Sequence, residues 1–249
     1  MRQVVLITGV VGGIGQATAT LFSKNGWYVV GIDKMPDYQG DNIDFYVQAD
    51  IYDPEQISIS VAHLSQQVDR LNALINNAAV QICKPIMETS VAEWDQVMAV
   101  NVRAAFLFSQ ACYSLLKQSQ GSIVNISSVH AIVTSANIAG YAASKGALTA
   151  FTRAQAIEFA VDKIRVNAVL PGAVDTPMLR AGLERGHLSA TNIEDLMSQL
   201  GEKTVMGRIG NPQEIAQAII FLADNQKSSF MTGQTLVVDG GATARLSTE

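Results

Sequence analysis

The chain has 249 residues, of which 48% are hydrophobic and 16% are charged, and its formal net charge at pH 7 is −5. This apolar content excludes an intrinsically disordered protein, and the acidic balance argues against nucleic acid as the main partner. No uninterrupted apolar run approaches the ~18 residues that a membrane span needs, and the N-terminus lacks the pattern of a secretion signal. We therefore expect a cytoplasmic protein that spans no membrane and binds no nucleic acid.

Short apolar runs alternate with helix-like stretches along the whole chain. The predicted strands are Val4–Thr8, Tyr28–Asp33, Phe45–Asp50, Leu71–Asn76, Ser122–Ser127, Arg165–Leu170 and Thr235–Val238. The predicted helices are Ile14–Lys24, Pro54–Val68, Val91–Lys117, Ala142–Val161 and Pro212–Asp224. Such alternation is typical of a parallel sheet with helices on both faces. We predict an α/β protein with a single doubly wound Rossmann domain over residues 1–249 and a seven-stranded parallel sheet.

The longest stretch without strand character runs from Ala173 to about Thr204. A compact domain rarely tolerates so long a connection unless it has a function. Two compatible interpretations are a helical excursion that packs its leucines and methionines on the core, and a mobile cover over a bound substrate.

The cysteines and histidines are scattered through the sequence. Cys83 and Cys112 lie far apart, and we expect two reduced thiols packed as small buried apolar residues. His63, His130 and His187 form no pair at ligand spacing, so we predict no metal site.

A glycine-rich turn follows the first predicted strand and opens the first predicted helix, in the order Thr8-Gly9-Val10-Val11-Gly12-Gly13-Ile14-Gly15. Glycines let the backbone approach a ligand without an intervening Cβ, and a helix N-terminus suits a pyrophosphate. This strand–turn–helix context predicts a dinucleotide site.

Asp33 ends the second predicted strand. A carboxylate there accepts hydrogen bonds from the adenosine ribose hydroxyls and repels a 2′-phosphate. We therefore expect NAD rather than NADP as the cofactor, although the neighbouring Lys34 offsets part of that repulsion.

Tyr141 and Lys145 are four residues apart, a spacing that places both side chains on one helix face. A phenol titrates near pH 10, which is too high for a general base at neutral pH. A nearby ammonium favours the phenolate, so we expect Lys145 to lower the pKa of Tyr141 and make it a general acid/base.

Six elements in this order resemble the short-chain dehydrogenase/reductase family in its standard, single-domain form. They are the glycine turn, Asn76-Asn77-Ala78-Ala79, Asn101-Val102, Ile126-Ser127-Ser128, Tyr141-x-x-x-Lys145 and Pro171-Gly172 with Thr176. The resemblance spans the chain from about Val4 to Gly241, and Ala79 replaces a glycine of the family pattern.

The resemblance implies a role for each matching residue. The catalytic set would be Ser128, which binds the substrate oxygen, Tyr141, Lys145 and Asn101, which holds a water that passes protons to Lys145. The cofactor would be bound by Gly9, Gly12, Gly13, Ile14, Gly15, Asp33, Asp50, Ile51, Asn77, Ala78, Tyr141, Lys145, Pro171, Gly172, Val174 and Thr176. Within this set, Lys145 would bind the nicotinamide ribose, Asp50 and Ile51 would cap the adenine ring, and Asn77 would contact the adenosine ribose. Val174 and Thr176 would contact the carboxamide. Ser128, His130 and Gln81 would line the substrate pocket.

We therefore expect an NAD-dependent oxidoreductase acting on a secondary alcohol or its ketone. One alternative is a 3-oxoacyl-carrier-protein reductase using NADPH, against which Asp33 and the acidic net charge count. Another is an NAD-sensing binding module without turnover, which would be expected to lack a member of the catalytic set. The alanine-rich helices are apolar nearly all round, and the resemblance implies that they pair at a subunit interface in a homodimer or homotetramer.

Overall fold

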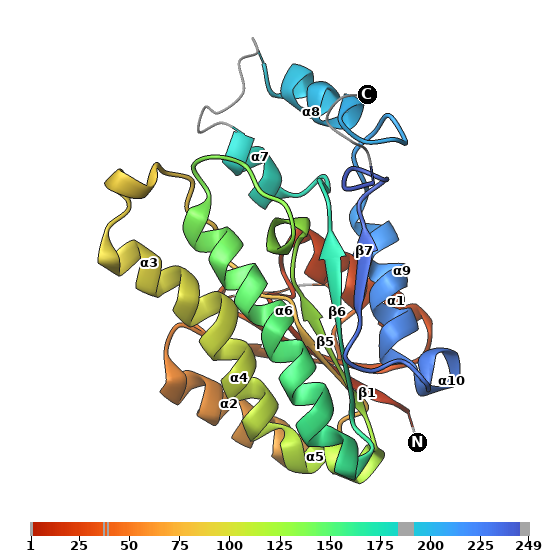
Figure 1. Cartoon of the computed structure of the whole chain (residues 1–249). Coiled ribbons are helices and arrows are strands. Elements are labelled where there is room, and N and C mark those ends of the chain that lie inside the picture. The colour runs from red at the N-terminus through yellow and green to blue at the C-terminus, as the bar shows by residue number, and fades with distance from the viewer. Residues whose placement is uncertain (1, 37, 39, 184–191, 245–249) are drawn as a thin grey trace.

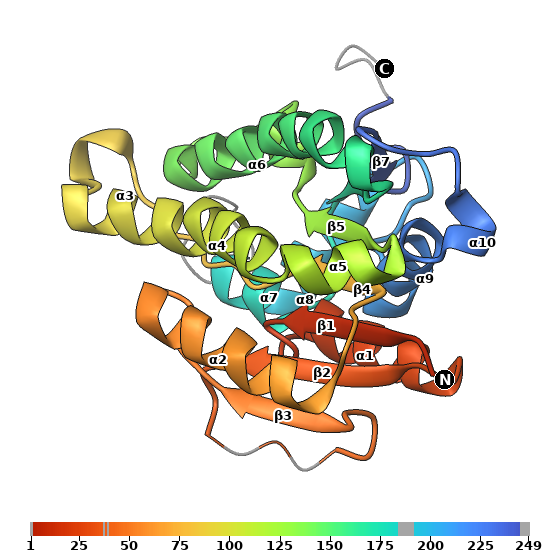
Figure 2. The same ribbon diagram turned by 90° about the horizontal axis from the view of Figure 1, so that it is seen from below.

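The computed structural model describes residues 2–36, 38, 40–183 and 192–244 of the chain. Within these residues lies a seven-stranded parallel sheet in the order β3-β2-β1-β4-β5-β6-β7. The strands are β1 (Val4–Thr8), β2 (Tyr28–Asp33), β3 (Phe45–Gln48), β4 (Ala73–Asn76), β5 (Ser122–Ile126), β6 (Arg165–Pro171) and β7 (Thr235–Val238). Helices cover both faces (Figures 1 and 2), so the predicted doubly wound Rossmann fold is confirmed.

Two helical layers sandwich the sheet. One contains α1 (Gly13–Lys24) and α9 (Pro212–Ala223), and the other contains α2 (Pro54–Gln67), α4 (Ala104–Ala111), α5 (Tyr113–Ser119) and α6 (Ala139–Phe159). A short helix, α10 (Asn225–Ser228), follows α9. In β1, Val4 and Leu6 pack toward the α2 layer, while Val5 and Ile7 pack toward the α1 layer. This alternation explains why the strand reads as a continuous apolar run.

The two edge strands depart from that pattern. β3 and β7 have partly exposed residues along their length, because each has a neighbouring strand on one side only. The third strand is also shorter than predicted: it ends at Gln48, so Asp50 and Ile51 lie in the turn before α2. There the Asp53 carboxylate accepts a hydrogen bond from the backbone N–H of Glu55, and Pro54 opens the helix.

The prediction of one continuous helix over Val91–Lys117 is wrong. The chain forms α3 (Val91–Met98), a π-helical turn at Ala99–Arg103, α4 and then α5, with a break at Cys112. A π-helical turn inserts one extra residue without changing helical propensity, so apolar periodicity does not reveal it. The turn contains Asn101.

The long segment before α9 contains two helices in its described part. They are α7 (Pro177–Leu183) and α8 (Ile193–Glu202), and Leu183, Leu196 and Met197 form a small apolar cluster between them. The predicted helices are therefore present there, but their apolar residues form a cluster of their own instead of packing on the two cores beside the sheet. Residues 184–191, with His187, lie outside the described residues. Across the described ranges, no helix combines the length and the apolar character needed to cross a bilayer.

The order of the strands reverses between β1 and β4, where successive crossovers leave in opposite directions. In doubly wound sheets, ligands bind at the carboxyl ends of the strands beside such a switch point. The carboxyl ends of β1, β4, β5 and β6 are therefore the expected location of the functional site.

Candidate active site

A cavity of about 1050 Å³ lies at this edge of the sheet. It is lined by the residues that the sequence assigned to the cofactor, which are Gly9, Gly12, Gly13, Ile14, Gly15, Asp33, Asp50, Ile51, Asn77, Ala78, Tyr141, Lys145, Pro171, Gly172, Val174 and Thr176. Ser128, His130 and Gln81 line it as well. The fold thus brings residues of the first 15 positions and residues beyond position 170 to the same cavity.

The glycine turn is packed too tightly for side chains. A Cβ at Gly9, whose φ is +65°, would lie 2.7 Å from the Cα of Ala78, and one at Gly15 would lie 2.2 Å from the carbonyl oxygen of Gly9. A Cβ at Gly13 would lie 2.9 Å from Thr176 Cγ2. With Gly12 as its N-cap, α1 therefore starts at the cavity with its first backbone N–H groups uncovered by side chains.

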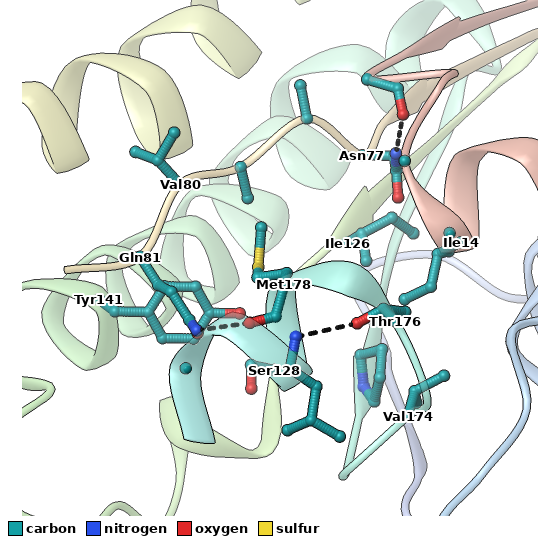
Figure 3. A pocket seen from close by; sticks show the side chains of 18 of the residues that line it. Ile14, Asn77, Val80, Gln81, Ile126, Ser128, Tyr141, Val174, Thr176 and Met178 are labelled. Carbon is teal, nitrogen blue, oxygen red and sulfur yellow. Dashed lines mark hydrogen bonds between the residues drawn. The ribbon is translucent and has the colours of Figure 1, made fainter. Parts of the chain in front are cut away.

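Asn77 pins this turn to β4. Its Nδ2 donates to the carbonyl oxygens of Thr8 at 2.9 Å and Gly9 at 3.0 Å, as Figure 3 illustrates for one of them. The Thr8 hydroxyl in turn accepts from the backbone N–H groups of Asn77 and Ala78, each at 3.1 Å. The amide nitrogen of Asn77 thus supports the glycine turn.

Asp33 bridges the glycine turn and the end of β2. Its carboxylate accepts hydrogen bonds from the backbone N–H groups of Val11 at 3.0 Å and Met35 at 3.3 Å. Lys34 also lines the cavity, and in the part of the chain that the structure describes its ammonium forms no ion pair. A fixed negative charge and a neighbouring positive charge therefore meet at this end of the cavity.

Tyr141 and Lys145 lie on the buried face of α6. Tyr141 is 9% and Lys145 2% exposed, and the Lys145 Nζ is 5.4 Å from the centre of the Tyr141 ring. The ammonium nitrogen donates to the carbonyl oxygen of Ile126 at 2.7 Å, which fixes it against the end of β5. The predicted sharing of one helix face is confirmed.

The two neighbouring serines have different surroundings. Ser127 is hydrogen-bonded to the carbonyl oxygen of Lys145 at 2.8 Å and to the hydroxyl of Thr149, so it ties β5 to α6. Ser128 instead lowers the pKa of Tyr141, and its hydroxyl accepts from the backbone N–H of His130 at 3.2 Å, which caps the short helical turn that begins at Val129. The choice of Ser128 as the serine that binds the substrate oxygen stays a prediction.

Burial controls the protonation of this site in the protein alone. It raises the pKa of Tyr141 to about 12; the hydrogen bond from Ser128 lowers that pKa and the Cys83 thiol raises it. Burial also lowers the pKa of Lys145 to about 7. The expectation that Lys145 lowers the pKa of Tyr141 is therefore not met in this structure, because desolvation dominates both groups.

Asn101 lies behind the cavity and is not among the residues that line it, unlike the other three residues of the predicted catalytic set. Its Oδ1 accepts from the backbone N–H of Val80 at 2.9 Å, and its Nδ2 donates to the Val80 carbonyl oxygen at 2.9 Å and the Ser144 hydroxyl at 3.0 Å. These bonds occupy the side-chain amide. A water passed toward Lys145 would have to be held by the main chain of the π-helical turn.

Gln81 and His130 line the cavity together with Tyr141. Gln81 reaches across to α7, where its Nε2 donates to the carbonyl oxygen of Met178 at 2.9 Å (Figure 3). The His130 ring stands edge-on to the Tyr141 ring, with centroids 5.8 Å apart, and its Nδ1 is hydrogen-bonded to the Thr134 hydroxyl. Both residues therefore line the cavity on the side of Tyr141, and their assignment to the substrate stays a prediction.

Several lining residues were not predicted as site residues. They include Cys83, Ala92, Gln96, Ser135, Met178, Leu183, Lys203 and Ala242. Cys83 and Cys112 are free, as expected, but Cys83 is only partly buried and lines the cavity, so its interpretation as a core residue is wrong. The sequence could have indicated that Cys83 lines the cavity, because Cys83 lies two residues after Gln81, which was predicted to line the substrate pocket. Among the described residues, no cluster of three or more His, Cys, Asp or Glu is arranged to hold a metal ion.

Comparison with known proteins agrees with this geometry. A family model described as enoyl-(acyl carrier protein) reductase matches residues 9–243. Cyclopentanol dehydrogenase of Comamonas sp. (strain NCIMB 9872) is 36% identical over 253 residues, with 97% of each chain covered.

Two solved structures share the fold. The ligand-free aldohexose dehydrogenase of Thermoplasma acidophilum is 34% identical with a TM-score of 0.92, covering 99% of this chain and 96% of that one. The 3-ketoacyl-(acyl-carrier-protein) reductase of Brucella melitensis, complexed with NADH, is 30% identical with a TM-score of 0.85, covering 97% and 98%. Such coverage by dehydrogenases and reductases, with one fold throughout, shows that the chain belongs to the short-chain dehydrogenase/reductase family, oxidoreductases that act on CH–OH groups with a nicotinamide cofactor.

Proposed function

We propose that the chain is an NAD-dependent oxidoreductase that transfers hydride between a secondary alcohol, or its ketone, and the nicotinamide. One observation carries the proposal: Tyr141 and Lys145 are buried together at the wall of the cavity that the glycine turn opens. Buried ionisable groups with shifted pKa values in a cleft are typical of catalytic sites.

The cavity fits a dinucleotide. The glycines leave no room for a Cβ yet keep the first turn of α1 free for phosphate oxygens, and the cavity continues from there to Tyr141. We assign cofactor binding to the residues predicted for it, with Asn77 acting through its amide oxygen. When bound, a nicotinamide cofactor supplies the hydride acceptor for oxidation and the hydride donor for reduction.

The protein's own contribution is proton transfer and orientation. In the oxidation direction, the phenolate oxygen of Tyr141 takes the proton of the substrate hydroxyl, while the Ser128 hydroxyl donates a hydrogen bond to that substrate oxygen. In the protein alone, burial lowers the pKa of Lys145 to about 7. A phenolate at Tyr141 favours the protonated form of Lys145, and the positive charge of that form then offsets the burial of the phenolate. In reduction, Tyr141 returns the proton.

The preference for NAD rests on Asp33. Its carboxylate is fixed by two backbone N–H groups at the end of β2, where it accepts ribose hydroxyls and repels a 2′-phosphate. Lys34 weakens this repulsion without removing it, because its side chain is exposed and solvent screens its charge.

The proposal is tested with purified protein, a panel of secondary alcohols, polyols and hydroxysteroids, and NADH absorbance. We expect turnover with NAD, and we expect Tyr141→Phe to lower kcat by about 10²-fold or more without loss of folding. Turnover retained in Tyr141→Phe would refute the role of that residue.

A 3-oxoacyl-carrier-protein reductase using NADPH is the second candidate. The likeness to the Brucella melitensis reductase supports its substrate class but not its cofactor, because that structure contains NADH. Titration of the protein with both cofactors separates the two, since tighter binding of NADP than of NAD would favour this alternative. A non-catalytic NAD-binding module is the third, and it would bind NAD without turning over any alcohol or carrier-bound substrate.

We further propose that the segment 173–204 covers the substrate and that the protein forms a homotetramer through α4 and α6. An exposed apolar stripe runs along α6 and into the short helical turn Ala160–Asp162 that follows it; it consists of Ala143, Ala150, Ala154, Ile157 and Val161. On the neighbouring α4, a half-exposed Phe106 packs edge-on against Phe151 of α6. A second copy would cover this stripe, because small residues let two helices approach closely.

A further inference from the structure

We infer that Gln81 is a specificity-determining residue: its side chain forms a fixed strap across the substrate end of the cavity and holds α7 close, so that compact secondary alcohols are favoured over bulky ones. The inference rests on the proposed function and adds to it the size class of the substrate.

The strap is defined by two contacts with α7. The Gln81 Nε2 donates to the Met178 carbonyl oxygen at 2.9 Å, which joins the loop after β4 to a helix 97 positions later (Figure 3). A Cβ at Gly182 would lie only 2.3 Å from the same nitrogen. The amide thus lies against the bare backbone of α7 at two positions one helical turn apart.

Gly182 itself supports this interpretation. Gly182 is the last residue but one of α7, and within a helix glycine is less favourable than alanine, so a packing contact gives a reason for its presence there. The three heavy atoms nearest to a Cβ placed at this position, outside the helix's own backbone, all belong to the Gln81 side chain. The side chain of Gln81 therefore occupies the space that a side chain at position 182 would need.

The other end of the strap is rigid. Val80, the residue before Gln81, is hydrogen-bonded through both its N–H and its carbonyl oxygen to the amide of Asn101. Asn101 also donates to Ser144, which precedes Lys145 on α6. The loop that carries Gln81 is therefore fixed to the catalytic helix, and the position of α7 is set relative to Tyr141.

The consequence is a limit on the size of the substrate. Gln81, Met178 and Gly182 all line the cavity that Tyr141 lines, so a bulky substituent on the reacting carbon must displace the strap and α7 to enter. Loss of the Gln81–Met178 hydrogen bond lets α7 move outward and enlarges this end of the cavity.

A double-mutant cycle tests the strap. Gln81→Glu keeps the length of the side chain but removes the donor to the Met178 carbonyl, and Gly182→Ala pushes the amide away without altering Gln81. For each variant we expect the ratio of kcat/KM for a naphthyl-substituted ethanol to that for cyclopentanol to rise by about fivefold, through KM. In Gln81→Ala, which removes the clash, we expect Gly182→Ala to add nothing.

The matched control is Gly146→Ala on α6, whose Cβ would meet no heavy atom within 4 Å and which we expect to leave the ratio unchanged. Hydrogen exchange of α7 amides gives a readout independent of turnover, and we expect it to accelerate in Gln81→Glu and Gly182→Ala. An unchanged size ratio, or additive effects of the two sites, would overturn the inference. If the wild-type protein oxidises no alcohol, the proposed function fails, while exchange in α7 still reports on the strap: unchanged exchange would refute it.

Discussion

Lys145 combines full burial with a functional group that normally carries a charge. Among the residues that the structure describes, its ammonium nitrogen has a single hydrogen-bond partner, the Ile126 carbonyl oxygen, and burial lowers its pKa to about 7. Tyr141 beside it has its pKa raised to about 12. Both shifts oppose the formation of charge, so the site is a dry environment in which any added positive charge acts strongly on the tyrosine.

The shifted pKa of Lys145 predicts a stability slope. Between its folded value near 7 and its ordinary value of 10.5, the unfolded chain binds the additional proton, so stability rises with pH. From pH 7.5 to 9 we expect this residue to add ~2 kcal/mol to the free energy of unfolding. Urea denaturation of the wild type and of Lys145→Met at both pH values measures it. Equal slopes in the two proteins would contradict the lowered pKa.

Asp33 carries the prediction about cofactor choice. Asp33→Asn keeps the shape of the side chain and removes the charge that repels a 2′-phosphate. We expect the ratio of kcat/KM with NADP to that with NAD to rise about a hundredfold, since a carboxylate close to a phosphate costs a few kcal/mol. Asp50→Asn, at another part of the same cavity, is the matched control and should leave the ratio unchanged. An unaltered ratio in Asp33→Asn would show that the charge of Asp33 does not set the cofactor preference.

At the scale of elements, the π-helical turn at Ala99–Arg103 joins parts of the site that come from distant segments. Asn101, 2% exposed, connects the loop after β4 to α6 through its contacts with Val80 and Ser144. It acts as a positioning residue for the catalytic helix and for the loop that carries Gln81.

Replacing Asn101 by alanine tests this positioning role. The change leaves the N–H and the carbonyl of Val80 without partners, so we expect the free energy of unfolding to fall by about 2–3 kcal/mol. Thermal or urea denaturation measures the loss. We also expect KM for alcohols to rise, because the base of the Gln81 strap loosens. A variant with unchanged stability and lowered kcat alone would instead support direct participation in proton transfer.

The sequence predicted best those features that depend on a single strand or a single helix. The bounds of β1, β2 and β7 and the shared face of Tyr141 and Lys145 follow from local periodicity. The break in the predicted helix over Val91–Lys117, the bonds of Asn101 and the reach of Gln81 to α7 depend on contacts between segments far apart in the chain. The raised pKa of Tyr141 and the lowered pKa of Lys145 depend on burial in the folded chain, which a sequence motif does not reveal.

For the whole molecule, the outer face of α6 remains to be explained. Ile157 and Val161 are 79% and 81% exposed, and alanines continue the stripe toward the start of the helix beside α4 (Figure 1). Arg153 and Glu158 lie exposed on the same helix, so a two-fold axis across it can place opposite charges together. Closed symmetric assemblies built on such self-complementary faces are the usual form of soluble oligomers.

Light scattering after gel filtration tests the tetramer. We expect the wild type to have about four times the 26.6 kDa of one chain, and Ala154→Arg, which places a long charged side chain in the stripe, to form smaller species. Gln199→Arg on α8, outside the stripe, is the control and should keep the mass of the wild type. Because Ala154 lies on the exposed side of α6, the substitution should leave the fold intact, which far-UV circular dichroism checks. A wild-type mass of one chain would refute the assembly, and an unchanged mass in Ala154→Arg would move the interface to another face.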